Sequence, residues 1–186
     1  MLTMNNIYFS SDLHLGHANI LTFVSEEPGL GQVRPGFASV EEMDELIIQR
    51  HNEIVGPTDK WYCMGDVGFG MKELGPKLAR LNGKKRLILG NHDYTTKKDF
   101  AIYFEHFEKV MESRRMGQVL FTHRPVHLGP DENRIKANVH GHIHEKNLPD
   151  QRYLNLSVEQ TDYYPVSMDY ITTVFRDRGI NVNIEA

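Results

Sequence analysis

Five short apolar segments of the chain each end directly before a cluster of polar side chains. They cover residues 7–9, 61–64, 87–89, 119–121 and 138–140. Short apolar runs of this kind are typical of buried strands, and strands deliver functional side chains to the loops at their carboxyl ends. We therefore expect the polar clusters to meet at one edge of a sheet.

The polar clusters contain side chains that bind metal ions. They are Asp12-Leu13-His14, Gly65-Asp66, Gly90-Asn91-His92-Asp93 and Gly141-His142-Ile143-His144, with His123 between the last two. Imidazole suits manganese, iron, nickel and zinc, whereas carboxylate and amide oxygens suit harder ions. No thiolate belongs to the set. The pattern therefore favours a manganese- or iron-class centre with two metals over a structural zinc site.

Helical patterns alternate with the apolar segments. We expect helices over residues 40–55, 71–81 and 97–106, and further strands over 153–156 and 180–184. Ser39 is suited to cap the first helix because Glu42 follows three residues later. Gly75-Pro76 interrupts the second pattern. Ser167 and Gly179 are expected to begin and end a short helix near the end of the chain.

This alternation predicts an α/β fold. It does not distinguish a sandwich of two sheets from a doubly wound single sheet. At 186 residues, the chain suits a single domain covering residues 1–186. The long loop over residues 26–39 is rich in Pro and Gly and is expected to border the functional site, since loops of this length are commonly functional.

Composition limits the classes of partner. Lys and Arg number 21 against 25 Asp and Glu, so the net charge of −4 disfavours long duplex nucleic acid. Cys63 is the only cysteine, which excludes an intramolecular disulfide and favours a reducing compartment. We see neither a signal-peptide pattern nor a stretch of membrane-spanning length. We expect a cytoplasmic protein without a membrane partner. The sequence does not reveal its oligomeric state.

The order and spelling of the polar clusters resemble the calcineurin-like metallophosphoesterases. The pattern of that family is Asp-x-His, Gly-Asp, Gly-Asn-His-Asp/Glu, His and Gly-His-x-His, and all five elements occur here in this order. The spelling of residues 11–20 is closest to compact bacterial and bacteriophage members. The resemblance implies a sandwich of two mixed sheets flanked by helices. It also implies two divalent transition-metal ions, with manganese favoured and iron, nickel or zinc as alternatives.

The resemblance assigns a role to each ligand. Asp66 would bridge the two metals. The first metal would also bind Asp12, His14 and His144, and the second Asn91, His123 and His142. A hydroxide bridging the metals would attack phosphorus.

Two further residues match catalytic positions of the family. His92 would donate a proton to the leaving oxygen, and Asp93 would orient the His92 ring by a hydrogen bond. Arg124 and His17 are candidates for substrate contact, because a guanidinium suits phosphate oxygens and His17 lies close to His14 in the sequence. Contact with a metal ligand is the alternative role for His17. A surface ion pair is the alternative role for Arg124.

The resemblance thus implies hydrolysis of phosphate monoesters or diesters, with small or nucleotide-type substrates favoured. A non-catalytic metal-binding scaffold on the same fold is one alternative. Such a scaffold would be recognised by the absence of some of the ligand residues. A nuclease is another, although the repair nucleases of this family carry additional domains for DNA.

Among the remaining histidines, His140 is expected to be buried, and His51 and His106 to be solvated on helices.

Overall fold

The computed structural model describes residues 6–94, 97–129 and 134–185 of the protein. Its strands are β1 (Ile7–Ser10), β2 (Lys60–Cys63), β3 (Lys84–Ile88), β4 (Lys109–Met111), β5 (Ser113–Met116), β6 (Val119–Thr122), β7 (Ala137–His140), β8 (Tyr153–Asn155) and β9 (Val166–Ser167). Its helices are α1 (Val40–Ile54), α2 (Met71–Arg80), α3 (Lys97–His106) and α4 (Met168–Asp177), with short 3-10 helices η1 (Ala18–Thr22) and η2 (Val158–Gln160).

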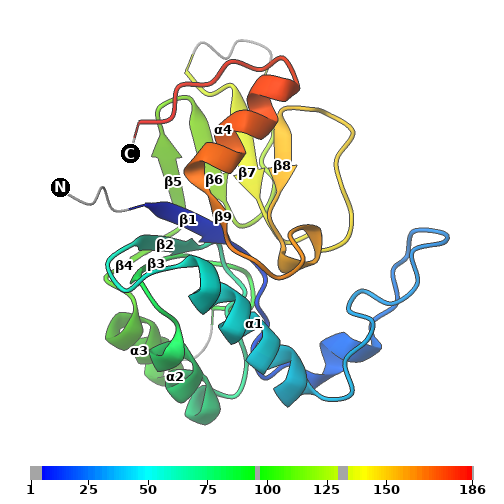
Figure 1. The fold of residues 1–186 in the computed structure, drawn as a ribbon, viewed down its shortest axis with the longest axis vertical. Coiled ribbons are helices and arrows are strands. Elements are labelled where there is room, and N and C mark those ends of the chain that lie inside the picture. The colour runs from blue at the N-terminus through cyan, green and yellow to red at the C-terminus, as the bar shows by residue number, and fades with distance from the viewer. Residues whose placement is uncertain (1–5, 95–96, 130–133, 186) are drawn as a thin grey trace.

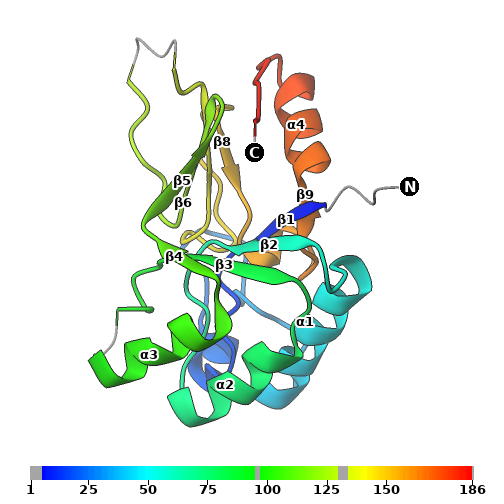
Figure 2. The same ribbon diagram turned by 90° about the vertical axis from the view of Figure 1, so that its left-hand side faces the viewer.

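The strands form two mixed sheets flanked by helices (Figures 1 and 2). The first has the order β4-β3-β2-β1-β9, and all its neighbours are parallel except β9, which is antiparallel to β1. The second has the order β5-β6-β7-β8, with only β5 antiparallel to its neighbour. The predicted α/β class is confirmed. The chain passes directly from the β4 edge of one sheet to the β5 edge of the other.

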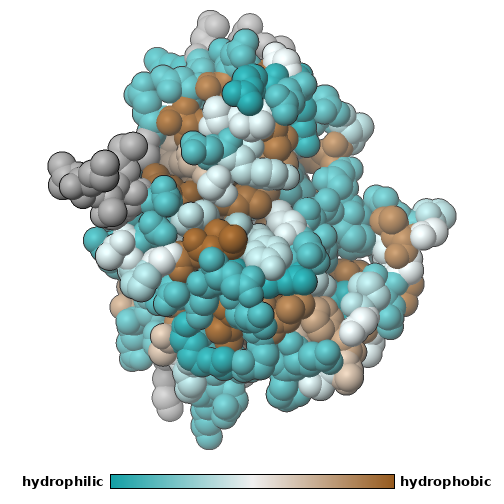
Figure 3. Space-filling view, in the orientation of Figure 1, coloured by the Kyte–Doolittle hydropathy of each residue, from teal (hydrophilic) through white to brown (hydrophobic). Residues whose placement is uncertain are grey.

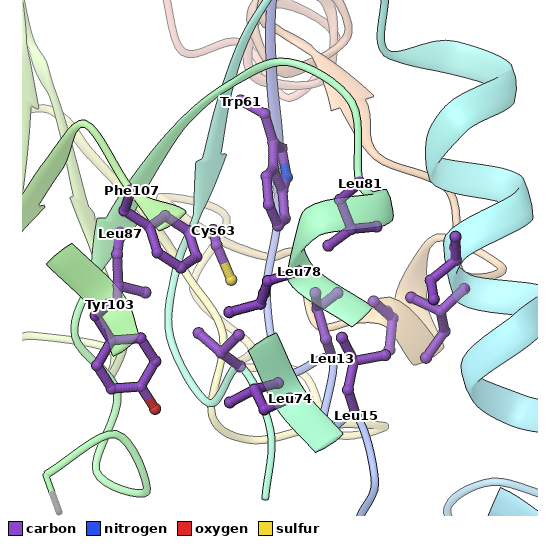
Figure 4. Packing of buried hydrophobic residues seen from close by; sticks show 14 of the residues in the cluster. Leu13, Leu15, Trp61, Cys63, Leu74, Leu78, Leu81, Leu87, Tyr103 and Phe107 are labelled. Carbon is purple, nitrogen blue, oxygen red and sulfur yellow. The ribbon is translucent and has the colours of Figure 1, made fainter. Parts of the chain in front are cut away.

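Alternation along the strands of the first sheet feeds two hydrophobic clusters. Trp61 and Cys63 of β2 join the cluster with α1, α2 and α3, which is seen from close by in Figure 4. Tyr62, between them, joins the cluster shared with the second sheet and α4. The ring of Phe9 stacks on Tyr62 and on Phe121 of β6, with centroid distances of 5.3 and 4.6 Å. The two sheets are therefore joined through stacked aromatic side chains.

Most of the predicted elements are present. The five apolar segments correspond to β1, β2, β3, β6 and β7, and the helical patterns to α1, α2 and α3. The Ser39 side chain accepts a hydrogen bond from the Glu42 amide, and Ser167 caps α4 in the same way. Helix α2 continues through Gly75-Pro76. Gly75 faces α3, where a Cβ atom on it would be in ordinary contact with His106 and Ile102, 3.4 Å away.

Two predictions about secondary structure and burial were wrong. Residues 180–184 form no strand, but Ile180, Val182 and Ile184 still pack on the second cluster. His51 is buried instead of solvated, with its ring against Trp61 and its Nε2 2.9 Å from the Asn82 carbonyl oxygen. Within the ranges that the structure describes, no helix has the length and apolar character needed to cross a membrane.

Helix α4 offers a test of the second cluster. Phe175 is fully buried there, whereas Tyr170 on the same helix is 47% exposed. We expect Phe175→Ala to lower the free energy of unfolding by about 3–5 kcal/mol, because it leaves a cavity in a packed core. Tyr170→Ala is the matched control and should change it by less than about 0.5 kcal/mol. Urea denaturation measures both. Similar losses in the two variants would contradict this description of the core.

Candidate metal centre

The predicted ligands come together at the carboxyl ends of strands from both sheets. Asp12, Asp66 and Asn91 follow β1, β2 and β3 of the first sheet. His123 follows β6 of the second sheet, and the His142-Ile143-His144 turn follows β7. The expectation of a single sheet edge is thus corrected, because the edges of two sheets converge on the site.

The ligands form two adjacent groups. The first group contains Asp12, His14 and His144, and the second contains Asp66, His123 and His142; within each, the potential ligand atoms lie within 4.8 Å of one another. Asn91 belongs beside the second group, since its Oδ1 lies 3.0 Å from His123 Nε2. The resemblance implies the same two sets of ligands, one for each metal.

One oxygen of Asp66 faces both groups. Its Oδ2 lies 3.6 Å from His14 Nε2 in the first group and 3.3 Å from His123 Nε2 in the second. The other oxygen, Oδ1, accepts a hydrogen bond of 2.8 Å from the His92 amide. Asp66 is therefore held with Oδ2 turned toward the space between the groups.

Unpaired buried atoms mark the first group. Among the described residues, Asp12 Oδ1 and His14 Nε2 are buried without a hydrogen-bond partner. Asp12 Oδ2, in contrast, accepts bonds from the His142 amide and the Ser157 hydroxyl, each 2.9 Å long. A buried polar atom without a partner costs about 1–3 kcal/mol. A cation would satisfy both atoms, so the donor set fits a metal ion.

The backbone is strained at the same residues. Seven non-glycine residues of the described chain have positive φ, and five of them are predicted ligands: Asp12, His14, Asp66, His142 and His144, with φ between 47° and 71°. Such conformations cost of order 1–3 kcal/mol each and are concentrated at functional sites. The turn at residues 142–144 also explains how two neighbouring histidines serve different groups.

Glycines allow the close approach of the ligand loops. A Cβ atom on Gly90 would lie 2.2 Å from Asp66 Oδ1, and one on Gly141 would lie 2.2 Å from Asp12 Oδ2. Neither position has room for a side chain. The loops that carry the predicted ligands can therefore approach each other only because these positions are glycine.

Three of the four predicted ligand histidines have a partner at Nδ1. His123 Nδ1 lies 2.9 Å from the Met64 carbonyl oxygen, and His144 Nδ1 lies 2.9 Å from Glu159 Oε1. His14 Nδ1 lies 3.0 Å from the Nδ1 atom of His17, whose ring packs on Phe69. Outer partners of this kind fix the tautomer and the ring orientation, with Nε2 as the atom that can bind a metal. His17 thus contacts a ligand residue, one of the two roles considered for it.

A buried ion pair supports the first group. Arg34 Nε donates to Glu159 Oε1 over 2.7 Å, and Arg34 also donates to the carbonyl oxygens of Leu13 and Asp12. Both side chains are almost fully buried. Sequence reasoning missed both residues. A signal for Glu159 was available, because it closely follows strand β8 in a polar cluster, as the predicted ligands follow their strands.

The role expected of Asp93 needs a correction. Its carboxylate is buried and accepts four hydrogen bonds, from the amides of Asp66, Val67 and Gly90 and from the hydroxyl of Tyr103. The neighbouring His92 side chain is exposed and lies near His14, with ring centroids 5.6 Å apart. Asp93 therefore anchors the loop that carries Asp66, and its observed contacts are not with the His92 ring. Arg124 is exposed beside His123.

Comparison with known proteins places the chain in a family. It is 30% identical to the uncharacterized protein MJ1445 of Methanocaldococcus jannaschii over 185 residues, which cover 91% of each chain. The chain belongs to the MJ1445 family. The gene 66 protein of Mycobacterium phage L5 is 28% identical over 173 residues, covering 76% of this chain and 78% of the phage protein. No protein-family model matches the chain.

A similar fold has been observed in a bacterial protein. The crystal structure of AQ665 from Aquifex aeolicus, a protein of unknown function, matches with a TM-score of 0.66 and 25% identity, over 92% of this chain and all of that one. Proteins similar to this member of the MJ1445 family therefore occur in an archaeon, a bacterium and a bacteriophage.

Burial and neighbouring charges shift the pKa values of several groups at the site in this member of the MJ1445 family. Burial and the nearby Arg34 lower the pKa of His14 to about 2, which keeps its ring neutral as a ligand requires. Burial raises the pKa of Asp66, but the hydrogen bond and charge of His123 outweigh it and hold the pKa at about 2. Arg34 and His144 likewise hold the pKa of the buried Glu159 at about 2. Both carboxylates are thus charged at neutral pH.

Glu159→Gln tests the orientation of His144. The amide keeps the shape but loses the charge and can turn its NH₂ group toward the ring. We expect the weakened outer contact to lower the affinity of one metal by about 10–100-fold. Binding of the other metal, at the His123 group, should change little. Calorimetric titration of metal-free protein with Mn²⁺ measures both steps, and exposed Glu185→Gln is the control. If Glu159→Gln weakened both metal-binding steps equally, this would contradict a role of Glu159 confined to the first group.

Proposed function

We propose that the protein is a metal-dependent phosphoesterase with two metals and a metallophosphoesterase-like fold. It would hydrolyse phosphate monoesters or diesters. The observation that carries this proposal is the Asp66 Oδ2 atom, which faces His14 of one ligand group and His123 of the other. Two cations about 3.5–4 Å apart require such a shared ligand. Manganese is favoured for a set of carboxylate, imidazole and amide ligands, with iron, nickel or zinc as alternatives.

The chain's own residues suit phosphoryl transfer. Two divalent cations bound here would supply Lewis acidity, which acidifies water and offsets the charge on phosphate. The exposed His92 ring lies close to His14 and can reach a leaving oxygen at the rim of the site. Arg124 lies beside His123 and offers a planar donor fork for phosphate oxygens. His92 thus provides the proton and Arg124 holds the phosphate.

Substrate size follows from the space beside the centre. Asn91, His123 and Arg124 line a hollow of about 620 Å³, within the range that holds a small organic molecule. The net charge of −4 gives no general attraction to a long polyanion. These features support a small phosphate ester or a nucleotide as substrate.

Asp66→Asn tests the shared ligand. The substitution keeps the side chain's shape and removes the charge that both cations share. We expect the metal content to fall from two ions per chain to fewer than one. Hydrolysis of p-nitrophenyl esters with Mn²⁺ should fall by on the order of 100-fold or more. Metal analysis by mass spectrometry and a colorimetric assay measure the two effects.

The exposed Asp169 on α4 supplies the matched control for this experiment. Asp169→Asn should keep both metals and full activity. An Asp66→Asn enzyme that remains fully active, or a wild-type enzyme fully active with one metal, would rule out the proposal.

His92→Ala separates proton donation from metal binding. The variant should retain its metals, because the His92 ring belongs to neither ligand group. On an ester with an alkyl leaving group we expect kcat to fall by on the order of 10²–10⁴-fold, the usual contribution of a general acid. On a p-nitrophenyl ester the loss should be much smaller, since that leaving group is stable as an anion. Equal losses on both esters would exclude the proton-donor role.

A further inference from the structure

Two separate hollows border the metal centre. The first, of about 620 Å³, contains the ligand residues Asn91 and His123, and also Tyr94, Leu120 and Val126. The second, of about 390 Å³, contains the ligand residues His142 and His144, and also Phe23, Val24 and Ile143. Among the described residues, the two linings have no residue in common. Each hollow therefore reaches the centre independently.

The hollows belong to different parts of the fold. The first lies where the end of β3 and the β4–β5 connection face β6, at the junction of the two sheets. The second lies between the loop after β7 and the arm, an irregular hairpin of residues 23–33. Figure 1 places the β4–β5 connection and the projecting arm on opposite sides of the molecule. The centre thus lies between two spaces that open on different sides.

Both hollows are suited to a flat apolar group. In the first, Tyr94 is 60% exposed and lines the hollow together with the aliphatic residues Leu120 and Val126. In the second, Phe23 is 47% exposed and lines the hollow together with Val24 and Ile143. Figure 3 shows apolar surface on the arm. An exposed aromatic ring next to aliphatic walls favours a stacked planar group.

We infer that the substrate is a phosphodiester whose two organic groups occupy the two hollows, one on each side of the phosphorus. The inference rests on the proposed function and resolves its choice between monoester and diester. A monoester has only one organic group and would leave one hollow empty. A diester fills both and places its phosphate between them, at Asp66 and the ligand histidines.

The two hollows then have different roles in the reaction. Water adds its oxygen to phosphorus, the bond from phosphorus to one ester oxygen breaks, and that oxygen takes up a proton. The products are an alcohol and a phosphate monoester. One hollow therefore holds the group that leaves, and the other holds the group that stays on phosphorus.

Three p-nitrophenyl esters and the Mn²⁺-loaded enzyme test this assignment. Bis(p-nitrophenyl) phosphate and methyl p-nitrophenyl phosphate have the same charge and the same leaving group, and they differ only in the group that stays. p-Nitrophenyl phosphate is the monoester. We expect the wild-type kcat/KM to be highest for the bis ester, about 10-fold above the methyl ester, because only the bis ester fills both hollows.

Tyr94→Ala and Phe23→Ala should have different effects. The variant in the hollow of the retained group should bring the bis and methyl esters to nearly equal kcat/KM. The variant in the hollow of the leaving group should lower kcat/KM for both diesters by about 10-fold and keep their ratio. Phe104→Ala removes another exposed aromatic side chain, on α3 outside both hollows, and should change neither value.

Binding without turnover gives an independent readout. Diphenylphosphinate and methyl(phenyl)phosphinate have the same charge and carry P–C bonds that the enzyme cannot hydrolyse. We expect diphenylphosphinate to bind about 10-fold more tightly to the wild-type enzyme in calorimetric titrations. Removing the aromatic side chain from either hollow should reduce this difference.

The outcomes distinguish the diester inference from the proposed function. Metal-dependent hydrolysis of the monoester alone, or diester constants that neither Tyr94→Ala nor Phe23→Ala changes, would overturn the diester inference and leave the proposed function standing. Failure to hydrolyse any of the three esters with any metal would overturn the proposed function, and the inference with it.

Discussion

The position of Asp66 Oδ2 between the two ligand groups is the constraint on which the site depends. Several contacts hold this carboxylate in place. Its amide donates to Asp93, its carbonyl oxygen accepts from the His14 amide, and its Oδ1 accepts from the His92 amide. Asp93 in turn accepts a hydrogen bond from the buried Tyr103 of α3. The core around the first sheet thus fixes the one atom that faces both groups.

Holding the ligands in this way has an energetic cost that the fold must offset. Five ligand residues have left-handed backbone conformations, and two ligand atoms are buried without partners. Each such feature costs on the order of 1–3 kcal/mol. Offsetting contributions come from the packed clusters on both faces of the first sheet. Bound cations would add to them, because a ligand specific to the folded state stabilises it.

The sequence predicted the parts of the fold that depend on local pattern. Strands such as β2 and β3 were predictable because their apolar runs end at turns with glycine, and α1 because Ser39 caps an amphipathic run. The short edge strands β4, β5 and β9 were not predicted. In β5, for example, residues 113–115 are exposed and polar and only Met116 is buried, so the strand lacks an alternating pattern. Residues 180–184 have that pattern but pack on the core without strand pairing.

For the site too, the features that depend on local pattern were predicted and the others were not. The seven predicted ligands meet because each follows the end of a strand, which is a local signal. Arg34 could not be assigned because it lies in a long loop, and its contacts with Glu159, Leu13 and Asp12 join distant parts of the chain. Asp93 was assigned to the wrong partner because adjacency in sequence suggested His92, whereas the fold turns its carboxylate inward to Asp66. Long-range polar contacts are thus what the sequence does not reveal.

The most direct test of the account is anomalous diffraction from crystals grown with Mn²⁺. The account predicts two peaks about 3.5–4 Å apart, with Asp66 Oδ2 between them, one bound by His14 and His144 and the other by His123 and His142. A single peak, or two peaks that do not share Asp66, would contradict it.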